Sequence, residues 1–288
     1  MRGAVGWALI VCLMVAMAPW MSGGQDTLAM FLGSGALLLG VLLTWRQPAV
    51  RGLKAGMLVW SAAGLLGWAA LSLAWTANRY STVVWLVMLV TAILAFRLSY
   101  VVAGWQWGRE RLLAAYVAVT LAVCAYGYWF YLTVSYERFV SSFYWPNPAA
   151  AFLIPGVLVG MFGLRKGGRV AWWWTAYLVV VGTAFALASS RGAALALGVA
   201  VLGYVVLRKW SKQAWVRFVC IIAAVVVLSY GLAVWHERIF NGVNTTTLTS
   251  RVAEAASGTT QSGSDRIYYL RSAVTLWARA PLWGSGAG

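Results

Sequence analysis

The sequence predicts an all-α fold, a polytopic transmembrane bundle of about nine spans, followed by an outer segment that carries an amphipathic surface helix. The first observation is a series of apolar runs without charged residues at their centres, and a helix needs about 20 apolar residues to cross a bilayer. The second is composition, because hydrophobic residues are 62% of the 288 and charged residues only 10%. The third is physical: backbone groups in lipid must be hydrogen-bonded within their own segment, which makes the runs helices.

The spans are expected in the following order, with ends placed to within about 2–4 residues. They are 4–21, 27–45, 55–75, 80–96, 111–133, 148–164, 170–188, 192–207 and 216–235. The first run follows Arg2 like a signal peptide, but no small-x-small cleavage site precedes the loop at residues 22–24, so we interpret it as a retained helix. Residues 1–235 then form a transmembrane domain, and 236–288 form an extracytoplasmic segment, the start of a large outer loop.

The basic residues predict which ends of the spans face the cytoplasm. Fourteen of the 22 Lys and Arg residues fall in alternate connections counted from the N-terminus, whereas the opposite short loops hold only Arg79, Arg138 and Arg191. Because short cytoplasmic loops carry the excess of basic residues, we expect a cytoplasmic N-terminus and an outer C-terminal segment in the inner membrane. The fourteen are Arg2, Arg46, Arg51, Lys54, Arg97, Arg109, Arg111, Arg165, Lys166, Arg169, Arg208, Lys209, Lys212 and Arg217.

Composition excludes several classes of function. The net charge of +16 is spread over short loops rather than over a compact basic domain, so we expect contacts with membrane lipids and no nucleic acid. Cys12, Cys124 and Cys220 lie inside apolar runs without metal-ligand spacing, and we interpret them as packing residues, with no metal and no other cofactor expected. The six acidic residues fall in loops or the tail, which argues against an ion-driven carrier and leaves a passive carrier or a flippase open.

Asn147 is the first candidate site residue at the outer face. Pro146 and Pro148 restrict the backbone on either side of it, just before the sixth span. Asn147 can cap that helix, which is the favoured interpretation, or it can offer hydrogen bonds to a sugar.

Arg191 is the second candidate, in a minimal outer turn between the seventh and eighth spans. A guanidinium at the membrane boundary is partly desolvated and needs an anion. The anion is a lipid phosphate or a carboxylate such as Glu137 or Asp265 in one interpretation, and a lipid diphosphate held by the guanidinium fork in the other. His236, the single histidine, lies at the outer end of the ninth span, and we interpret it as a solvated or capping residue.

The tail from Ser262 on predicts a helix over 265–279, capped by Ser264 or Asp265. Its apolar residues repeat at helical spacing on one face, which favours a helix lying on the membrane surface. That face consists of Ile267, Leu270, Val274 and Trp277. The basic residues turned to headgroups or to a ligand are Arg266, Arg271 and Arg279.

Three patches in order along the chain resemble the O-antigen ligase and O-antigen polymerase superfamily of bacterial envelope proteins. Pro146-Asn147, with Ala150, Leu153 and Pro155, resembles its PN-x-x-A segment. Ser190-Arg191-Gly192-Ala193 resembles its SRGA helix. Asp265-Arg266, Trp277 and the stretch from Pro281 to Gly288 resemble its R…W…A…PLxGxGxG stretch. The resemblance covers about the last half of the chain.

The resemblance implies an enzyme of the glycosyltransferase type. Members transfer a glycan from an undecaprenyl-diphosphate carrier to an acceptor, either lipid A-core or a growing polysaccharide, at the outer face of the cytoplasmic membrane. Arg191 and Arg266 would hold the diphosphate, with Asn147 and Arg271 as further substrate-binding residues. Positioned cations would stabilise the charge that develops on the leaving group.

One departure concerns the catalytic base. In the family, a histidine near an HN-x-Y-L motif follows the glycine run, whereas this sequence stops at Gly288, so no catalytic residue is identified and we expect a C-terminally truncated chain. A non-enzymatic carrier or flippase for lipid-linked glycans, and a structural subunit of polysaccharide assembly, remain alternatives. Ligase and polymerase, and the sugar and acceptor, are not distinguished by these residues.

Overall fold

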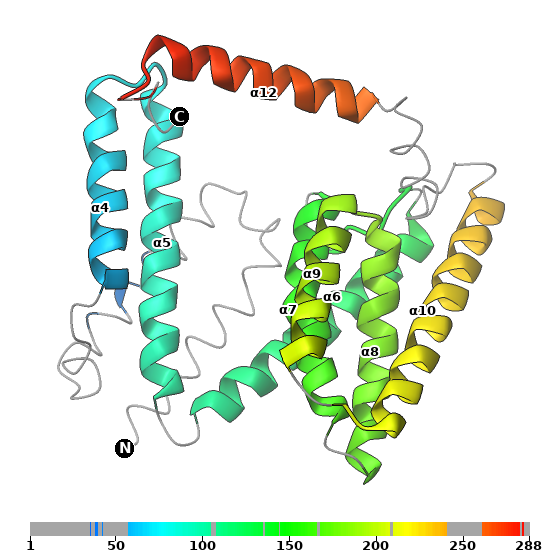
Figure 1. Ribbon diagram of the computed structural model, residues 1–288. Coiled ribbons are helices and arrows are strands. Elements are labelled where there is room, and N and C mark those ends of the chain that lie inside the picture. The colour runs from blue at the N-terminus through cyan, green and yellow to red at the C-terminus, as the bar shows by residue number, and fades with distance from the viewer. Residues whose placement is uncertain are drawn as a thin grey trace. The chain divides into compact units, whose positions relative to one another are not determined.

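Every regular element in the described part of the computed structural model is a helix (Figure 1). The structure describes residues 57–104, 108–134, 136–143, 145–165, 168–207, 210–240 and 261–282, together with residues 35, 38, 39, 42 and 284. Within these residues there are eight numbered α-helices and one 3-10 helix, and no strand. The all-α prediction is therefore confirmed for the described part of the chain.

The chain divides into two compact units, and the division falls inside helix α6 (Gly108–Thr133), between Ala115 and Tyr116. The first unit contains α4 (Met57–Leu71), η3 (Ser72–Ala74), α5 (Arg79–Ala103) and α12 (Gln261–Arg279). The second contains the rest of α6 and the four helices that follow. These are α7 (Pro146–Leu164), α8 (Gly168–Ala188), α9 (Arg191–Leu207) and α10 (Lys212–Ile239). The predicted domain boundary at 235/236 stays a prediction.

Helices α7 and α8 form the centre of the second unit. Helix α8 packs against both α7 and α10, and α9 packs against α7 (Figure 1). In the most apolar stretch of α7, half of the residues are buried, and in that of α8 44% are buried. In α10 the share is 11%. The outward faces of α9 and α10 instead expose Leu, Val and Ile side chains, as expected of helices that meet lipid.

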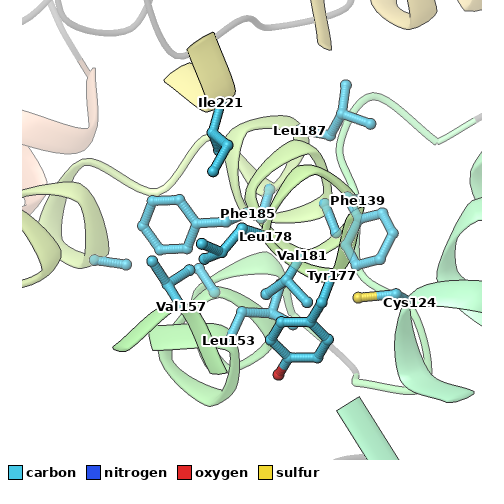
Figure 2. Packing of buried hydrophobic residues seen from close by; sticks show 14 of the residues in the cluster. Cys124, Phe139, Leu153, Val157, Tyr177, Leu178, Val181, Phe185, Leu187 and Ile221 are labelled. Carbon is cyan, nitrogen blue, oxygen red and sulfur yellow. The ribbon is translucent and has the colours of Figure 1, made fainter. Parts of the chain in front are cut away.

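The hydrophobic core of this unit is made by side chains from every one of its helices (Figure 2). Leu153 and Val157 of α7 meet Leu178 and Val181 of α8, and Cys124 of α6 is fully buried among them. The interpretation of Cys124 as a packing residue is thus confirmed. Cys220 is a free thiol on the exposed face of α10.

Small residues allow α7 and α8 to approach closely. Gly156, Gly160 and Gly163 lie three or four residues apart on α7, which places them along one side of the helix. A Cβ at Gly156 would meet the Tyr177 hydroxyl at 3.1 Å, and one at Gly160 would lie 2.6 Å from the Leu178 side chain. Membrane helices, which gain little from the hydrophobic effect, associate through such close backbone contacts.

Two tyrosine hydroxyls connect helices by bonding to backbone carbonyls. Tyr116 of α6 donates to the Phe152 carbonyl of α7 at 2.6 Å, in the turn before Pro155, whose missing amide weakens the helix there. Tyr128 of α6 donates to the Val180 carbonyl of α8, also at 2.6 Å. These bonds fix α6 against the two central helices.

The predicted runs from residue 55 on are all helices in the structure, and most ends agree within four residues. The largest difference is α5, which continues past the predicted end at 96 to Ala103. In the described part of the chain, five helices are long and apolar enough to cross a membrane, and Trp60–Ala74 and Arg191–Leu207 are shorter apolar helices. The predicted spans 4–21 and 27–45 lie outside the described residues almost entirely, so the total of nine stays a prediction.

The tail helix exists, but its predicted start is wrong. Helix α12 begins at Gln261, so Ser264 and Asp265 lie within its first turns rather than at its N-cap. Its C-terminal end at Arg279 agrees with the prediction, and Pro281 follows. The apolar face formed by Ile267, Leu270, Val274 and Trp277 is more than half exposed at each residue. Its docking on a membrane surface stays a prediction.

Candidate functional site

Five pieces of the second unit meet at one of its ends, which we call the site end. They are the C-terminal end of α6, the 134–145 segment, the start of α7, the turn between α8 and α9, and the last turn of α10. Hydrogen bonds and ring contacts between these pieces, described below, establish their proximity. Residues 143–155 and 189–192, which the sequence singles out separately, thus lie at the same end of one helical unit.

The 134–145 segment folds into the bundle instead of looping away from it. Phe139 is fully buried, and its amide donates to the Leu187 carbonyl of α8 at 3.1 Å. Ser141 is buried too, with its hydroxyl donating to the Val123 carbonyl of α6 at 2.6 Å. Its φ of 56° is a left-handed conformation that L-residues adopt at a cost, and the buried hydrogen bond offsets part of that cost.

A glycine in α6 makes room for this segment. Gly127 is buried, and a Cβ there would collide with the Phe139 ring and lie 2.8 Å from the Ser141 Cβ. The segment therefore depends on the absence of one side chain in the neighbouring helix.

The turn between α8 and α9 contains only Ser189 and Ser190, as expected from the sequence. Ser189 is buried with a φ of 49°, and its amide and hydroxyl both bond to the Ala186 carbonyl. The Ser190 hydroxyl accepts from the Ala193 amide at 3.4 Å, a long N-terminal capping bond for α9. Arg191 is therefore the first residue of α9, and it is half-buried.

The start of α7 differs from the prediction in one respect. Trp145 is the N-cap, with an extended backbone and no capping side chain, and Pro146 is the first helical residue. Asn147 thus lies inside the first turn, and its favoured interpretation as the helix cap is wrong. Proline is suited to the first helical position because its missing amide would have no partner there, and the helix starts two residues earlier than predicted.

Arg138 is the residue that joins these elements, and sequence reasoning missed it. Its Nε donates to the Ala188 carbonyl at 3.0 Å, and its Nη2 donates to the carbonyls of Ala188 at 2.7 Å and Ser189 at 3.0 Å. The same Nη2 lies 3.5 Å from Oδ1 of Asn147. The only signal in the sequence is that Arg138 is one of three basic residues in the short loops that are expected to face outward and to be poor in basic residues.

The site end combines features that favour an anion. Helices α7 and α9 both begin there, but Pro146 and Pro148 have no amide hydrogen, so the free amides with their partial positive charge are mainly those of α9. Arg191 and Arg138 add two guanidinium groups to the same end. An anion at a helix N-terminus beside an arginine is a common arrangement for phosphate.

His236 is buried, so its interpretation as a solvated or capping residue is wrong. Its ring is 0% exposed and stacks on Tyr131 of α6 with centroids 4.4 Å apart. Nε2 lies 3.4 Å from the Val134 carbonyl, and Nδ1 has no hydrogen-bond partner among the described residues. The ring also contacts Phe240 at 4.6 Å. His236 thus connects α10 to the end of α6 mainly as an aromatic core residue.

Replacing His236 separates packing from hydrogen bonding. His236→Ala leaves a cavity and should lower the free energy of unfolding by about 2–4 kcal/mol. His236→Phe keeps the ring contacts and removes a nitrogen without a partner, so it should stay within about 1 kcal/mol of wild type. Unfolding of the detergent-solubilised protein measures both. A phenylalanine variant as unstable as the alanine variant would show instead that the weak contact to Val134 matters.

The four predicted substrate-binding residues fall in both units. Arg191 and Asn147 lie at the site end of the second unit. Arg138 donates to the side chain of Asn147 and to the carbonyl of Ser189, two residues before Arg191. Arg266 and Arg271 lie on α12 of the first unit, and Arg271 is exposed. The grouping of these two arginines with Arg191 stays a prediction.

A family model described as O-antigen ligase matches residues 176–288, which include Arg191, Arg266 and Arg271. No curated protein and no solved structure matches the chain significantly. The helices described above and this match together make the chain a multi-pass membrane protein. From Ala176 in the middle of α8 to Gly288, the chain is therefore similar to the O-antigen ligase family.

Proposed function

We propose that the protein transfers a glycan from undecaprenyl diphosphate to a lipid A-core or polysaccharide acceptor at the outer face of the cytoplasmic membrane. The match of residues 176–288 to the O-antigen ligase family supports glycan transfer in general. The single observation that carries the more specific proposal is the meeting of the α9 N-terminus, which begins at Arg191, with Asn147 at the site end. This arrangement is suited to the diphosphate of a membrane-bound donor.

The position of basic residues supports the assignment of the outer face. The connections at the opposite end of the second unit hold Arg165, Arg169, Lys212 and Arg217, whereas the site end holds fewer bases. Because basic loops remain cytoplasmic, the site end would face outward. A lipid-linked donor would then enter from the membrane with its diphosphate at the depth of Arg191.

The chemistry of the proposed reaction asks for anion stabilisation above all. The bond from the anomeric carbon to the diphosphate oxygen breaks, and a bond to an acceptor hydroxyl oxygen forms. Negative charge on the leaving diphosphate grows as the bond breaks, and fixed donors aimed at it lower the barrier. In our proposal the Arg191 guanidinium and the α9 amides supply these donors. The proton of the acceptor passes to a base outside the residues assigned to the site.

Arg266 and Arg271 would add charge from α12. They lie on either side of the apolar stripe of this helix, because successive residues turn by about 100° around an α-helix. With the stripe against the membrane, both positions would be at headgroup level, where a lipid diphosphate lies. We therefore assign them to the donor as well, with Asn147 as a hydrogen-bonding residue for the diphosphate or the first sugar.

The test is binding of undecaprenyl diphosphate to the purified full-length chain in detergent. Arg191→Ala should weaken binding by at least about tenfold, since hydrogen bonds to charged groups contribute about 1.5–3 kcal/mol. Arg266→Ala should weaken it in the same direction. Arg169→Ala, which removes an exposed arginine from the opposite end of α8, serves as the matched control and should bind as wild type.

Proteoliposomes distinguish the proposal from a flippase. Addition of a labelled lipid-linked glycan and an acceptor should give labelled product that depends on Arg191. Movement of the lipid across the bilayer without product would favour the carrier function instead. Equal affinity of wild type, Arg191→Ala and Arg266→Ala for undecaprenyl diphosphate would remove the proposed site.

A further inference from the structure

The side chain of Arg138 is used in a way that a simple ligand-binding arginine is not. Three of its hydrogen bonds go to the carbonyls of Ala188 and Ser189, at 2.7–3.0 Å, and it is half-buried in this position. A fourth, longer contact reaches Asn147 Oδ1 at 3.5 Å. The guanidinium therefore bridges the end of α8 and the start of α7.

The end of α8 presents an electrostatic problem to any anion at the site end. The last carbonyls of a helix have no partners within it and carry about half a negative charge. Helix α8 ends at Ala188, and Arg191 opens α9 only three residues later, so the negative end of one helix adjoins the positive end of the next. Without compensation, the α8 carbonyls would repel a phosphate bound beside Arg191.

Arg138 covers those carbonyls with a full positive charge. Its donors point at the Ala188 and Ser189 oxygens, which both satisfies them and cancels their field. The contact to Asn147 has a second effect, because a guanidinium accepts nothing and must face the amide oxygen. The NH₂ group of Asn147 is then directed away from Arg138, in an orientation in which it can donate to an anion.

We propose that Arg138 is a positioning residue for the polyprenyl diphosphate, acting through the α8 carbonyls and Asn147 rather than by contact with the ligand. This inference rests on the proposed function of the site end. The effect of Arg138 on binding affinity should then depend on the charge of the ligand, because the repulsion that Arg138 cancels grows with the number of negative charges on the ligand. A residue that only stabilised the fold would affect charged and uncharged ligands equally.

The experiment compares three probes that share one polyprenyl chain: undecaprenyl diphosphate, undecaprenyl monophosphate and undecaprenol. Binding is measured with the full-length chain in detergent for wild type, Arg138→Gln and Arg138→Lys. We expect Arg138→Gln to weaken the diphosphate by about tenfold and the monophosphate by about threefold, with undecaprenol unchanged. Arg138→Lys keeps the charge without the fork, so it should recover part of the loss for the diphosphate.

Arg169→Gln is the matched control. It also removes one positive charge, but from the exposed start of α8, whereas Arg138 contacts the end of that helix. It should change none of the three affinities. The unfolding midpoint of each variant is recorded in the same detergent. If Arg138→Gln does not fold, the Arg138→Lys data decide, since an intermediate affinity for the diphosphate alone supports the proposal.

The outcomes separate this inference from the function on which it rests. Equal loss of all three probes in Arg138→Gln, or no loss at all while Arg191→Ala loses the diphosphate, would overturn the role of Arg138 and leave the site standing. Wild-type protein that binds undecaprenyl diphosphate no better than undecaprenol would overturn the proposed function itself.

Discussion

Gly160→Leu is expected to prevent the second unit from folding. A Cβ at this position would already lie 2.6 Å from both Cγ and Cδ2 of Leu178 and 3.0 Å from the Tyr177 ring. Leu178 and Tyr177 of α8 are buried in the hydrophobic core of the second unit, where the packed side chains leave little space for them to move. Overpacking of this kind costs about 1–3 kcal/mol even for small insertions, and a leucine adds three more carbons that must separate α7 from α8. We therefore expect loss of a monodisperse, thermally cooperative species in detergent.

Gly198→Leu is the matched control for this prediction. Gly198 also lies inside an apolar helix of the second unit, but a Cβ there meets nothing within 4 Å. The same substitution should leave the protein monodisperse and at least as stable as wild type, because leucine is the better helix former by about 1 kcal/mol. A Gly160→Leu protein that behaved like the Gly198→Leu protein would contradict the close packing of α7 on α8.

The helices of the described part could be predicted from the sequence because each one carries its signal locally. An apolar run such as 170–188 can be recognised without knowledge of its packing partners, because a membrane span is defined by its length and hydrophobicity. The structure places α8 at Gly168–Ala188, two residues from the predicted start and at the predicted end. Errors occur where polar turns adjoin the run, as at α5, which continues through Arg97 to Ala103.

Caps were harder to predict, because a cap depends on backbone geometry rather than on residue type. Asn147 and Asp265 are both good capping residues, and both lie inside helices that begin earlier. For α7 the reason is Pro146, whose fixed φ suits the first helical position. For α12 the helix extends back through Gln261, and the sequence before Asp265 offers no apolar periodicity to signal this.

The contacts of the site end could not be predicted, because they join residues far apart in the chain. Arg138 donates hydrogen bonds to carbonyls about fifty positions away. Every residue has a backbone carbonyl, so residue type does not indicate which carbonyl accepts such a bond. His236 and Tyr131 stack across an even longer interval, and nothing in either local sequence indicates the contact. The sequence did predict that Arg191 lies at the start of a helix, because the turn between the two apolar runs is very short.

Gly127→Ala is expected to displace the 134–145 segment and abolish binding of undecaprenyl diphosphate while leaving the helices in place. The added methyl group would collide with the Phe139 ring, which is fully buried and anchored by the bond from its amide to Leu187. Arg138 directly precedes Phe139 in the chain, so its bonds to the α8 carbonyls would be lost together with the position of Phe139. Alanine in place of glycine normally stabilises a helix by about 1 kcal/mol, so any loss reports the collision.

Hydrogen–deuterium exchange of the backbone amides of residues 136–143, measured alongside lipid binding, follows this change directly. Faster exchange should be confined to the segment and its contacts in α8, because α7 packs on α8 through other residues, Gly160 and Leu178 among them. Gly231→Ala, on α10 where a Cβ meets nothing within 4 Å, should leave exchange and binding unchanged. Wild-type exchange and affinity in Gly127→Ala would mean that the segment tolerates the methyl group, and that its buried position is not what holds Arg138 against α8.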